Sequence, residues 1–216
     1  MQNNTPFSWE YFKDAPLVGI IRGLDMETIL QVAKVYKEAE LSTLEVTMNT
    51  PDAIKIISTL RKEFPKLNIG AGTVCSLNEL QMAMKAGSQF IVTPILDEEV
   101  IKNCVTRNIP IFPGAFTPTE IYKAWNLGAS AVKVFPATQL GPQYIKDILG
   151  PLNEIKLMPT GGVSKDNIKS FFQAGAYGAG LGGSLFNKAL IGNGDYKGLR
   201  NHFKSFKKEL EGILPE

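Results

Sequence analysis

Short apolar runs alternate with longer amphipathic segments along the 216 residues of the chain. The runs recur roughly every 20–26 residues, which is the length that a strand, a helix and two short loops require. They lack alternation of apolar and polar positions, which is typical of parallel strands buried on both faces. The pattern predicts eight strands, at Leu17–Ile21, Thr43–Thr47, Asn68–Ala71, Gln89–Thr93, Ile109–Phe112, Ala131–Phe135, Ile155–Pro159 and Ala179–Gly182.

The segments between these runs carry helix signals. Thr50-Pro51 and Thr117-Pro118 each place a hydroxyl before a proline, as at a helix start. The stretches 76–79 and 117–120 fit the capping box, in which two side chains satisfy free backbone N–H groups. Three segments end in a glycine that tolerates the left-handed conformation of a helix end; these are Gly87, Gly128 and Gly175.

Eight strand–helix units without an internal linker predict one domain over residues 1–216. We expect an α/β fold, a single (β/α)8 TIM barrel, with a short N-terminal helix from Phe7 to Asp14 covering its bottom. An open, doubly wound sheet is the alternative, and it requires one or two of the runs to be misread.

Composition narrows the possible functions. Hydrophobic residues make up 44% and charged residues 20% of the chain, and the net charge is +2 without a run of like charges. This gives no electrostatic argument for a nucleic acid or membrane partner. The start of the chain has no secretory signal pattern, so we expect a cytoplasmic protein in which Cys75 and Cys104 are reduced, packed thiols. His202 is the only histidine and is expected far from the strand ends, so we predict no metal and no cofactor.

Two charged residues lie inside apolar runs near strand ends, where barrel enzymes place their active sites. Burial would lower the pKa of Lys133, and a neutral amine attacks ketones to form an iminium that accepts electrons during C–C cleavage. A buried carboxylate at Glu45 would move protons to and from a substrate. The alternatives are a lysine whose tip reaches solvent in a simple ion pair, and a buried Lys–Glu pair that serves only the structure.

Glycines after the last two predicted strands indicate an anion site. The stretches Thr160-Gly161-Gly162 and Gly182-Gly183-Ser184 would expose backbone N–H groups where barrels commonly bind phosphate. Plain tight turns are the alternative reading.

Five further residues would complete the pocket. Arg22 would pair with a substrate carboxylate, unless it forms a salt bridge with Glu45, and Thr73 would donate a hydrogen bond to the same carboxylate. Asn49 would belong to the rim, and Pro94 and Phe135 would be walls.

Motifs in order along nearly the whole chain resemble the 2-keto-3-deoxy-6-phosphogluconate (KDPG) and 4-hydroxy-2-oxoglutarate (KHG) aldolases. These motifs are Leu44-Glu-Val-Thr47, Gly70-Ala-Gly-Thr-Val74, Val92-Thr-Pro94, Pro113-Gly114, Val132-Lys-Val-Phe-Pro136, Gly141-Pro-Gln-Tyr-Ile-Lys146, Pro159-Thr-Gly-Gly-Val163 and Gly182-Gly-Ser184. The resemblance implies a soluble, metal-independent homotrimer that releases pyruvate, with glyceraldehyde 3-phosphate or glyoxylate as the second product. It also implies a Schiff base on Lys133, acid–base catalysis by Glu45, a carboxylate contact from Thr73, and phosphate contacts from Gly161, Gly162, Gly183 and Ser184.

One position departs from the phosphogluconate pattern. That branch often has an arginine where this chain has Asn49, followed by Thr50-Pro51. Arg22 resembles the first-strand arginine of the phosphogalactonate aldolases, which also share an Asn-x-Pro segment and the stretch at 141–146. The same reaction on 2-keto-3-deoxy-6-phosphogalactonate is therefore an alternative. A phosphosugar epimerase or isomerase and a non-catalytic phospho-ligand binder are the other two.

Overall fold

The computed structural model describes residues 5–213, and all the strand pairs in it are parallel. One sheet has the order β5-β4-β3-β2-β1-β9 and a second has the order β6-β7-β8. The strands are β1 (Leu17–Ile21), β2 (Thr43–Thr47), β3 (Asn68–Gly72), β4 (Ile91–Val92), β5 (Ile111–Phe112), β6 (Gly114–Ala115), β7 (Val132–Val134), β8 (Leu157–Pro159) and β9 (Ala179–Leu181). Seven of the eight predicted runs thus contain one strand each, and the eighth, Asn68–Ala71, extends by one residue to Gly72.

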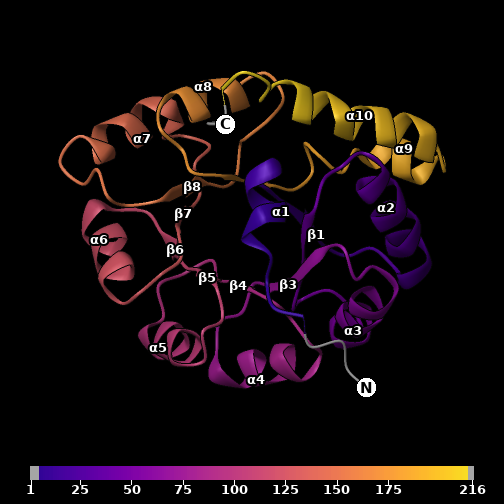
Figure 1. Ribbon diagram of the computed structural model, residues 1–216, viewed down its shortest axis with the longest axis horizontal. Coiled ribbons are helices and arrows are strands. Elements are labelled where there is room, and N and C mark those ends of the chain that lie inside the picture. Colours follow the sequence, from indigo (N-terminus) through magenta and orange to yellow (C-terminus); the bar gives the residue numbers. More distant parts are fainter. Residues whose placement is uncertain (1–4, 214–216) are drawn as a thin grey trace.

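Helices follow the strands and form an outer ring around them (Figure 1). Most helices of the ring bury one apolar face, so the ring covers the sheets on the outside, while α1 lies apart from it and α9 has no buried residue. The helices are α1 (Trp9–Asp14), α2 (Met26–Glu38), α3 (Ala53–Glu63), α4 (Leu77–Lys85), α5 (Glu98–Thr106), α6 (Pro118–Asn126), α7 (Gly141–Leu149), α8 (Ile168–Gln173), α9 (Lys188–Gly192) and α10 (Tyr196–Lys208).

The two sheets meet at two places. A parallel bridge joins Thr160 after β8 to Gly180 in β9. On the other side, Pro113 separates β5 from β6, and its carbonyl accepts a hydrogen bond of 2.9 Å from the Lys133 N–H. A proline cannot donate to a strand ladder, which explains the break. The predicted barrel is therefore seen in part, as parallel strands that curl in two sheets. The strand order never reverses, so the doubly wound alternative is wrong.

An aromatic cluster fills the interior below the strands. Phe12 of α1 is fully buried, and its ring lies 6.1 Å from that of Phe112 and 6.0 Å from that of Phe7. The Asn68 side chain fixes the start of α1, because it accepts from the Ser8 N–H at 2.8 Å and donates to the Ser8 carbonyl at 2.9 Å. Figure 1 shows α1 across the centre of the strand ring, which confirms the expected N-terminal helix with a start at Trp9.

The predicted helix ends have mixed outcomes. The capping box at Thr117 and Glu120 is present, and Gly87, Gly128 and Gly175 all adopt positive φ after their helices. Only half of the box at 76–79 forms, because the Glu79 carboxylate accepts from the N–H of residue 75 instead. The predicted cap at Thr50 is wrong. Its hydroxyl contacts that of Thr47 at 3.0 Å, and α3 begins later, at Ala53.

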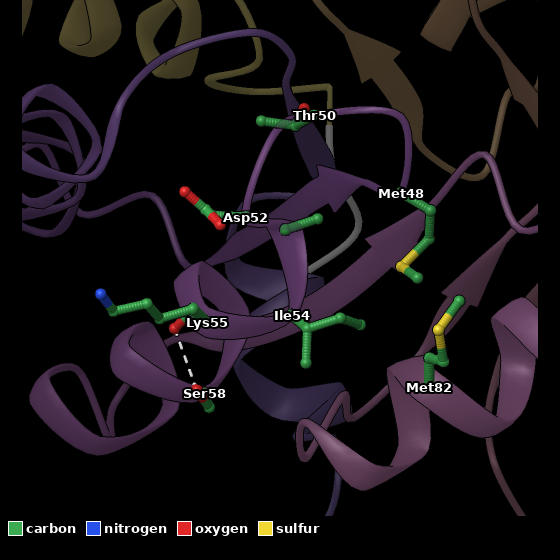
Figure 2. A pocket seen from close by; sticks show the side chains of 8 residues that line it. Met48, Thr50, Asp52, Ile54, Lys55, Ser58 and Met82 are labelled. Atoms are coloured by element: carbon green, nitrogen blue, oxygen red, sulfur yellow. Dashed lines mark hydrogen bonds between the residues drawn. The ribbon is translucent and has the colours of Figure 1, made fainter.

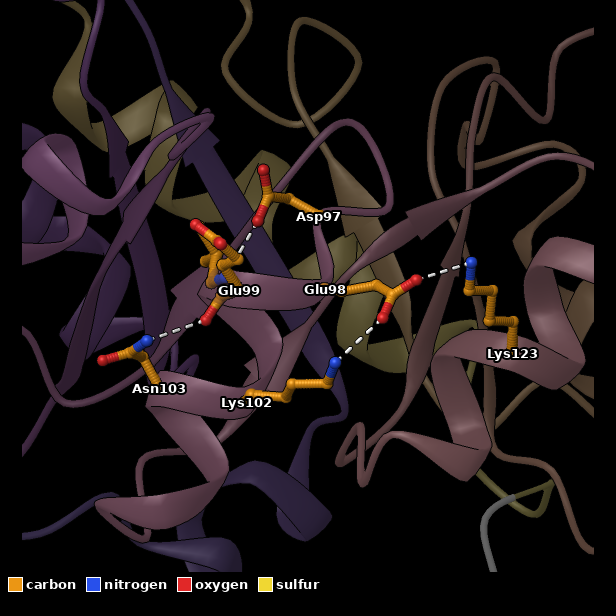
Figure 3. A network of polar contacts seen from close by, with 7 residues as sticks. Asp97, Glu98, Glu99, Lys102, Asn103 and Lys123 are labelled. Atoms are coloured by element: carbon orange, nitrogen blue, oxygen red, sulfur yellow. Dashed lines mark hydrogen bonds and ion pairs between the residues drawn. The ribbon is translucent and has the colours of Figure 1, made fainter.

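Ion pairs tie neighbouring helices together at the surface. Glu98 of α5 binds Lys102 at 2.9 Å within its own helix and Lys123 of α6 at 2.6 Å (Figure 3). These bonds, that to Lys123 first, lower the pKa of Glu98 to about 2. Such exposed pairs contribute little to stability, so the ring depends mainly on its buried face. None of the helices within residues 5–213 is long and apolar enough to cross a membrane.

We expect Phe12→Ala to lower the free energy of unfolding by about 3–5 kcal/mol, because it leaves a cavity at the centre of the aromatic cluster. Tyr11→Ala in the same helix is the matched control, since Tyr11 is exposed and its loss should cost about 0.5 kcal/mol or less. Urea denaturation measures both. Equal losses in the two variants would show that α1 does not close the core.

Candidate active site

A cavity of about 910 Å³ opens at the carboxyl ends of the strands. It brings together twelve of the thirteen side chains and glycines that the sequence predicts for the site. These are Arg22, Glu45, Thr73, Pro94, Lys133, Phe135, Thr160, Gly161, Gly162, Gly182, Gly183 and Ser184. They come from strands and loops across the whole chain, so the fold is what assembles the cavity.

Asn49 is the exception, and its expected place in the rim is wrong. It does not line the cavity, and its side chain is exposed. The backbone turns sharply here, since the Thr50 N–H donates to the Thr47 carbonyl at 2.9 Å. This turn carries Asn49 outward from the end of β2.

Lys133 lies in the middle of β7 and is only 6% exposed. Burial lowers the pKa of its amine, the charge of Glu45 raises that pKa, and the charge of Arg22 lowers it. The Nζ atom lies 4.7 Å from the centre of the Phe135 ring, so Phe135 is a wall directly against the amine. The alternative of a solvent-exposed lysine in a simple ion pair is therefore wrong, and the amine is available in its neutral form at lower pH than an ordinary lysine.

Glu45 lies in β2 and is only 1% exposed. Burial raises the pKa of its carboxyl to about 7, and the charges of Lys133 and Arg22 oppose the rise. Its Oε2 atom is buried without a hydrogen-bond partner in the part of the chain that the structure describes. A buried polar atom without a partner is costly, and such atoms concentrate at sites that await a ligand. The group is therefore poised to exchange a proton near neutral pH.

The expected alternatives of direct pairing do not appear. Among residues 5–213, no ion pair within 4.0 Å joins Glu45 to Lys133 or to Arg22. Arg22 is exposed at the end of β1 and also lines the cavity. The three charges thus act on one another through space, with room between them for a ligand.

Thr73 has an unusual backbone at the edge of the cavity. Its φ is +56°, in the left-handed region that a β-branched residue rarely adopts. Outliers of this kind cost about 1–3 kcal/mol and cluster at binding sites. The fold therefore keeps Thr73 in a strained backbone conformation, and this conformation gives its hydroxyl one particular position at the edge of the cavity.

The two glycine loops present free donors to the cavity. The backbone N–H groups of Gly162 and Gly183 donate to no other residue within 5–213, whereas Gly161 directly follows Thr160 in the bridge to Gly180 and its N–H takes part in that bridge. The Ser184 hydroxyl donates to the Val163 carbonyl at 2.7 Å, which links one loop to the other. The free donors are therefore backbone groups, held in place by a serine that the sequence had suggested as a direct contact.

His202 corrects another expectation. Its ring Nε2 lies 2.9 Å from the Ser184 carbonyl, so the histidine contacts the loop after β9 and is not remote from the strand ends. No sequence pattern indicates this contact, because His202 lies 18 residues after Ser184 and meets it only when α10 folds back toward the loop. Phe186 anchors the same loop, with its ring 5.6 Å from that of Phe203.

Two further residues escaped the sequence reasoning. Lys188, the first residue of α9, lines the cavity beside the glycine loops. Cys75, which was expected to be packed, is exposed at its surface, and partial desolvation together with the charge of Glu79 raises the pKa of its thiol. Cys104 is buried, as expected. A basic residue on the helix after the last strand is the signal that would have identified Lys188.

A second, shallower hollow of about 560 Å³ lies beside α3 and α4 (Figure 2). Figure 2 shows the Met48 and Met82 side chains on facing sides of it. Ser58 there donates to the Lys55 carbonyl at 2.9 Å, an ordinary bond within a helix. The hollow contains none of the buried charged groups, so the chemistry belongs to the larger cavity.

Proteins similar to this chain are aldolases, an activity that the residues of this cavity fit. The family model described as KDPG and KHG aldolase matches residues 9–201. A 2-dehydro-3-deoxy-phosphogluconate aldolase of Haemophilus influenzae is 36% identical over 84% of this chain and 86% of its own. A 2-dehydro-3-deoxy-6-phosphogalactonate aldolase of Escherichia coli is 35% identical over 79% of this chain and 84% of its own.

A solved structure shows the same fold. The KDPG aldolase of Legionella pneumophila, with pyruvate captured as a covalent carbinolamine intermediate, has a TM-score of 0.84 and 27% identity. The match covers 91% of this chain and 96% of that one. The chain therefore belongs to the KDPG and KHG aldolase family and is a carbon–carbon lyase.

Proposed function

We propose that this chain is a Schiff-base aldolase that cleaves KDPG to pyruvate and glyceraldehyde 3-phosphate, or KHG to pyruvate and glyoxylate. The observation that carries the proposal is that Lys133 and Glu45 are both buried and both line the same cavity. The structural relative from Legionella, with its covalent pyruvate, supports the same chemistry. The epimerase and the non-catalytic binder have no comparable support.

The first step is attack of the Lys133 amine on the C2 ketone of the substrate. The carbinolamine that forms loses water to give a protonated imine, which withdraws electrons from the adjacent carbons. Burial favours this step because it makes the neutral amine accessible. The protonated imine on Lys133 is the electron sink, so the proposed reaction uses no metal and no cofactor.

Glu45 then acts on the bound imine. Its carboxylate takes the proton of the C4 hydroxyl, the C3–C4 bond breaks, and the aldehyde leaves behind the enamine of pyruvate. The carboxyl returns the proton to C3, and water hydrolyses the imine to free pyruvate and Lys133. A pKa of about 7 suits a group that accepts and donates a proton in one cycle.

The remaining cavity residues bind the two ends of the substrate. We assign the phosphate to the two glycine loops, where the N–H groups of Gly162 and Gly183 are free and Gly161 lets the backbone approach closely. Arg22 and Thr73 receive the carboxylate at the opposite edge, and Pro94 and Phe135 form the walls. Thr160, Gly182 and Ser184 shape the loops, and Asn49 has no contact role in this proposal.

Two residues bear on the C4 configuration of the preferred substrate. Arg22 on β1 and the absence of an arginine at Asn49 favour 2-keto-3-deoxy-6-phosphogalactonate as the alternative substrate. The relatives include both a phosphogluconate and a phosphogalactonate aldolase at nearly equal identity. Pyruvate release from these two acids and from KHG distinguishes the three.

The wider setting is part of the same proposal. We infer one domain over residues 1–216, in which the two sheets act as one eight-stranded barrel through the bridge at Thr160 and the break at Pro113. We propose a cytoplasmic homotrimer, with exposed Phe116 and Tyr122 among the apolar side chains available for contact. Light scattering should give three times 23.7 kDa, and a mass of one chain contradicts the trimer.

Borohydride reduction in the presence of pyruvate should fix one pyruvate-derived adduct to the chain, located at Lys133 by peptide mass spectrometry. Lys133→Met should remove both the adduct and the activity, because no other amine lies in the buried end of the cavity among the described residues. Lys188→Met is the matched control, since Lys188 lines the same cavity at its exposed edge. An adduct that persists in Lys133→Met contradicts the assignment.

Gly183→Ala tests the phosphate loops separately. A methyl group at this position meets nothing within 4 Å, so the fold should be unchanged, while the methyl would crowd an anion bound to the backbone N–H. We expect KM to rise about tenfold for the phosphorylated acids, which is the loss of about 1.4 kcal/mol of binding. KM for unphosphorylated KHG should stay constant, and an equal rise for all three substrates would place the phosphate elsewhere.

A further inference from the structure

We propose that Gly72 is the positioning residue for the Glu45 carboxylate, because the carboxyl group occupies the space that any side chain at position 72 would need. This inference rests on the proton-transfer role proposed above for Glu45. It concerns a glycine of the Gly70-Ala-Gly-Thr73 stretch, in a strand that contributes no charged group.

The register of the strands brings the two residues together. In the pairing of β2 with β3, Glu45 lies opposite Gly70, and Thr47 lies opposite Gly72. Side chains two residues apart point to the same face of a strand. Glu45 therefore shares a face with Gly70 and Gly72, and its long side chain extends one level along the strand toward the cavity.

The distances show how close this approach is. A Cβ atom built on Gly72 would lie 2.3 Å from Glu45 Oε1, 2.6 Å from its Cδ and 3.2 Å from its Cγ. No real Cβ atom tolerates the first two distances, so an alanine at this position would displace the carboxyl group. The backbone of Gly72 has an ordinary φ, so its need for glycine comes from this contact and not from conformation.

The contact with Gly72 is also what holds the carboxyl group in place. Oε1 lies against the bare Cα of Gly72, and Oε2 is buried without a partner among the described residues. No hydrogen bond within residues 5–213 fixes either oxygen, so the position of the carboxyl group depends on the space left by the missing side chain. Since misplacement of a catalytic group by about 1 Å can cost on the order of 10²-fold in rate, the missing side chain controls the proton transfer.

Gly70 offers a matched comparison within the same strand. A Cβ atom there would lie 2.5 Å from the Phe90 ring, which belongs to the aromatic cluster below. A substitution at Gly70 therefore disturbs the core, whereas a substitution at Gly72 meets the movable end of one side chain. Substitution of Gly70 should therefore lower stability, whereas substitution of Gly72 should displace the Glu45 carboxyl group.

The test measures two half-reactions with pyruvate on the same samples. Borohydride trapping reports imine formation by Lys133, and exchange of the C3 protons in D₂O reports proton transfer by Glu45. We expect Gly72→Ala to trap pyruvate normally and to lower exchange per trapped imine by about 10- to 100-fold. Gly70→Ala should lower the thermal midpoint of unfolding and keep this ratio within about twofold of the parent, because it does not touch the carboxyl.

A double-mutant cycle adds a readout that a general structural effect would not move. The side chain of Glu45→Asp is one carbon shorter and overlaps less with a methyl group at position 72, so adding Gly72→Ala in that background should lower the exchange ratio by less than it does in the parent. If Gly72→Ala alone fails to fold, recovery of folding in the double variant supports the proposal, and failure of both overturns it. A folded Gly72→Ala with the parental exchange ratio also overturns it.

Glu45→Gln separates this inference from the proposed function. Loss of exchange in Glu45→Gln together with normal exchange in Gly72→Ala contradicts only the role of Gly72. Normal exchange in Glu45→Gln contradicts the acid–base role of Glu45 itself, and the role of Gly72 falls with it.

Discussion

The cost of removing an ammonium and a carboxylate from water determines how this active site works. Lys133 and Glu45 are both almost fully buried, yet no ion pair within 4.0 Å joins them. Burial of both groups therefore favours their neutral forms, and each group's charge partly offsets the penalty on the other. The result is a carboxyl group with a pKa of about 7 and an amine whose pKa lies below that of an ordinary lysine, and both shifts favour Schiff-base chemistry.

The fold surrounds the amine and the carboxyl group with very few polar atoms. Phe135 covers the amine on one side, and the glycines of β3 leave room for the carboxyl on the other. The contacts proposed for the substrate phosphate are backbone N–H groups in loops that Ser184 and His202 hold in place. Chemistry and recognition thus use different parts of one cavity, so loop residues can change the sugar acid without affecting the reacting pair.

Much of this could be predicted from the sequence, because charged residues inside apolar strands are rare and parallel strands end on one edge. Lys133, Glu45 and both glycine loops line one cavity, as the sequence indicated. The sequence does not indicate the positions that a turn or a tertiary contact determines. Asn49 turns outward in a tight bend, and His202 reaches Ser184 from a helix that lies near β9 only in three dimensions. The break at Pro113 was also unforeseen, although proline cannot donate to a ladder.

The most direct test of this account is a carbon-13 NMR titration of the Glu45 carboxyl group in the parent protein and in Lys133→Met. The account predicts a pKa near 7 in the parent, and a higher pKa in the variant, because the variant loses the positive charge that opposes the effect of burial. A Glu45 carboxyl that titrates near 4.5 in both proteins, like an exposed glutamate, would contradict it.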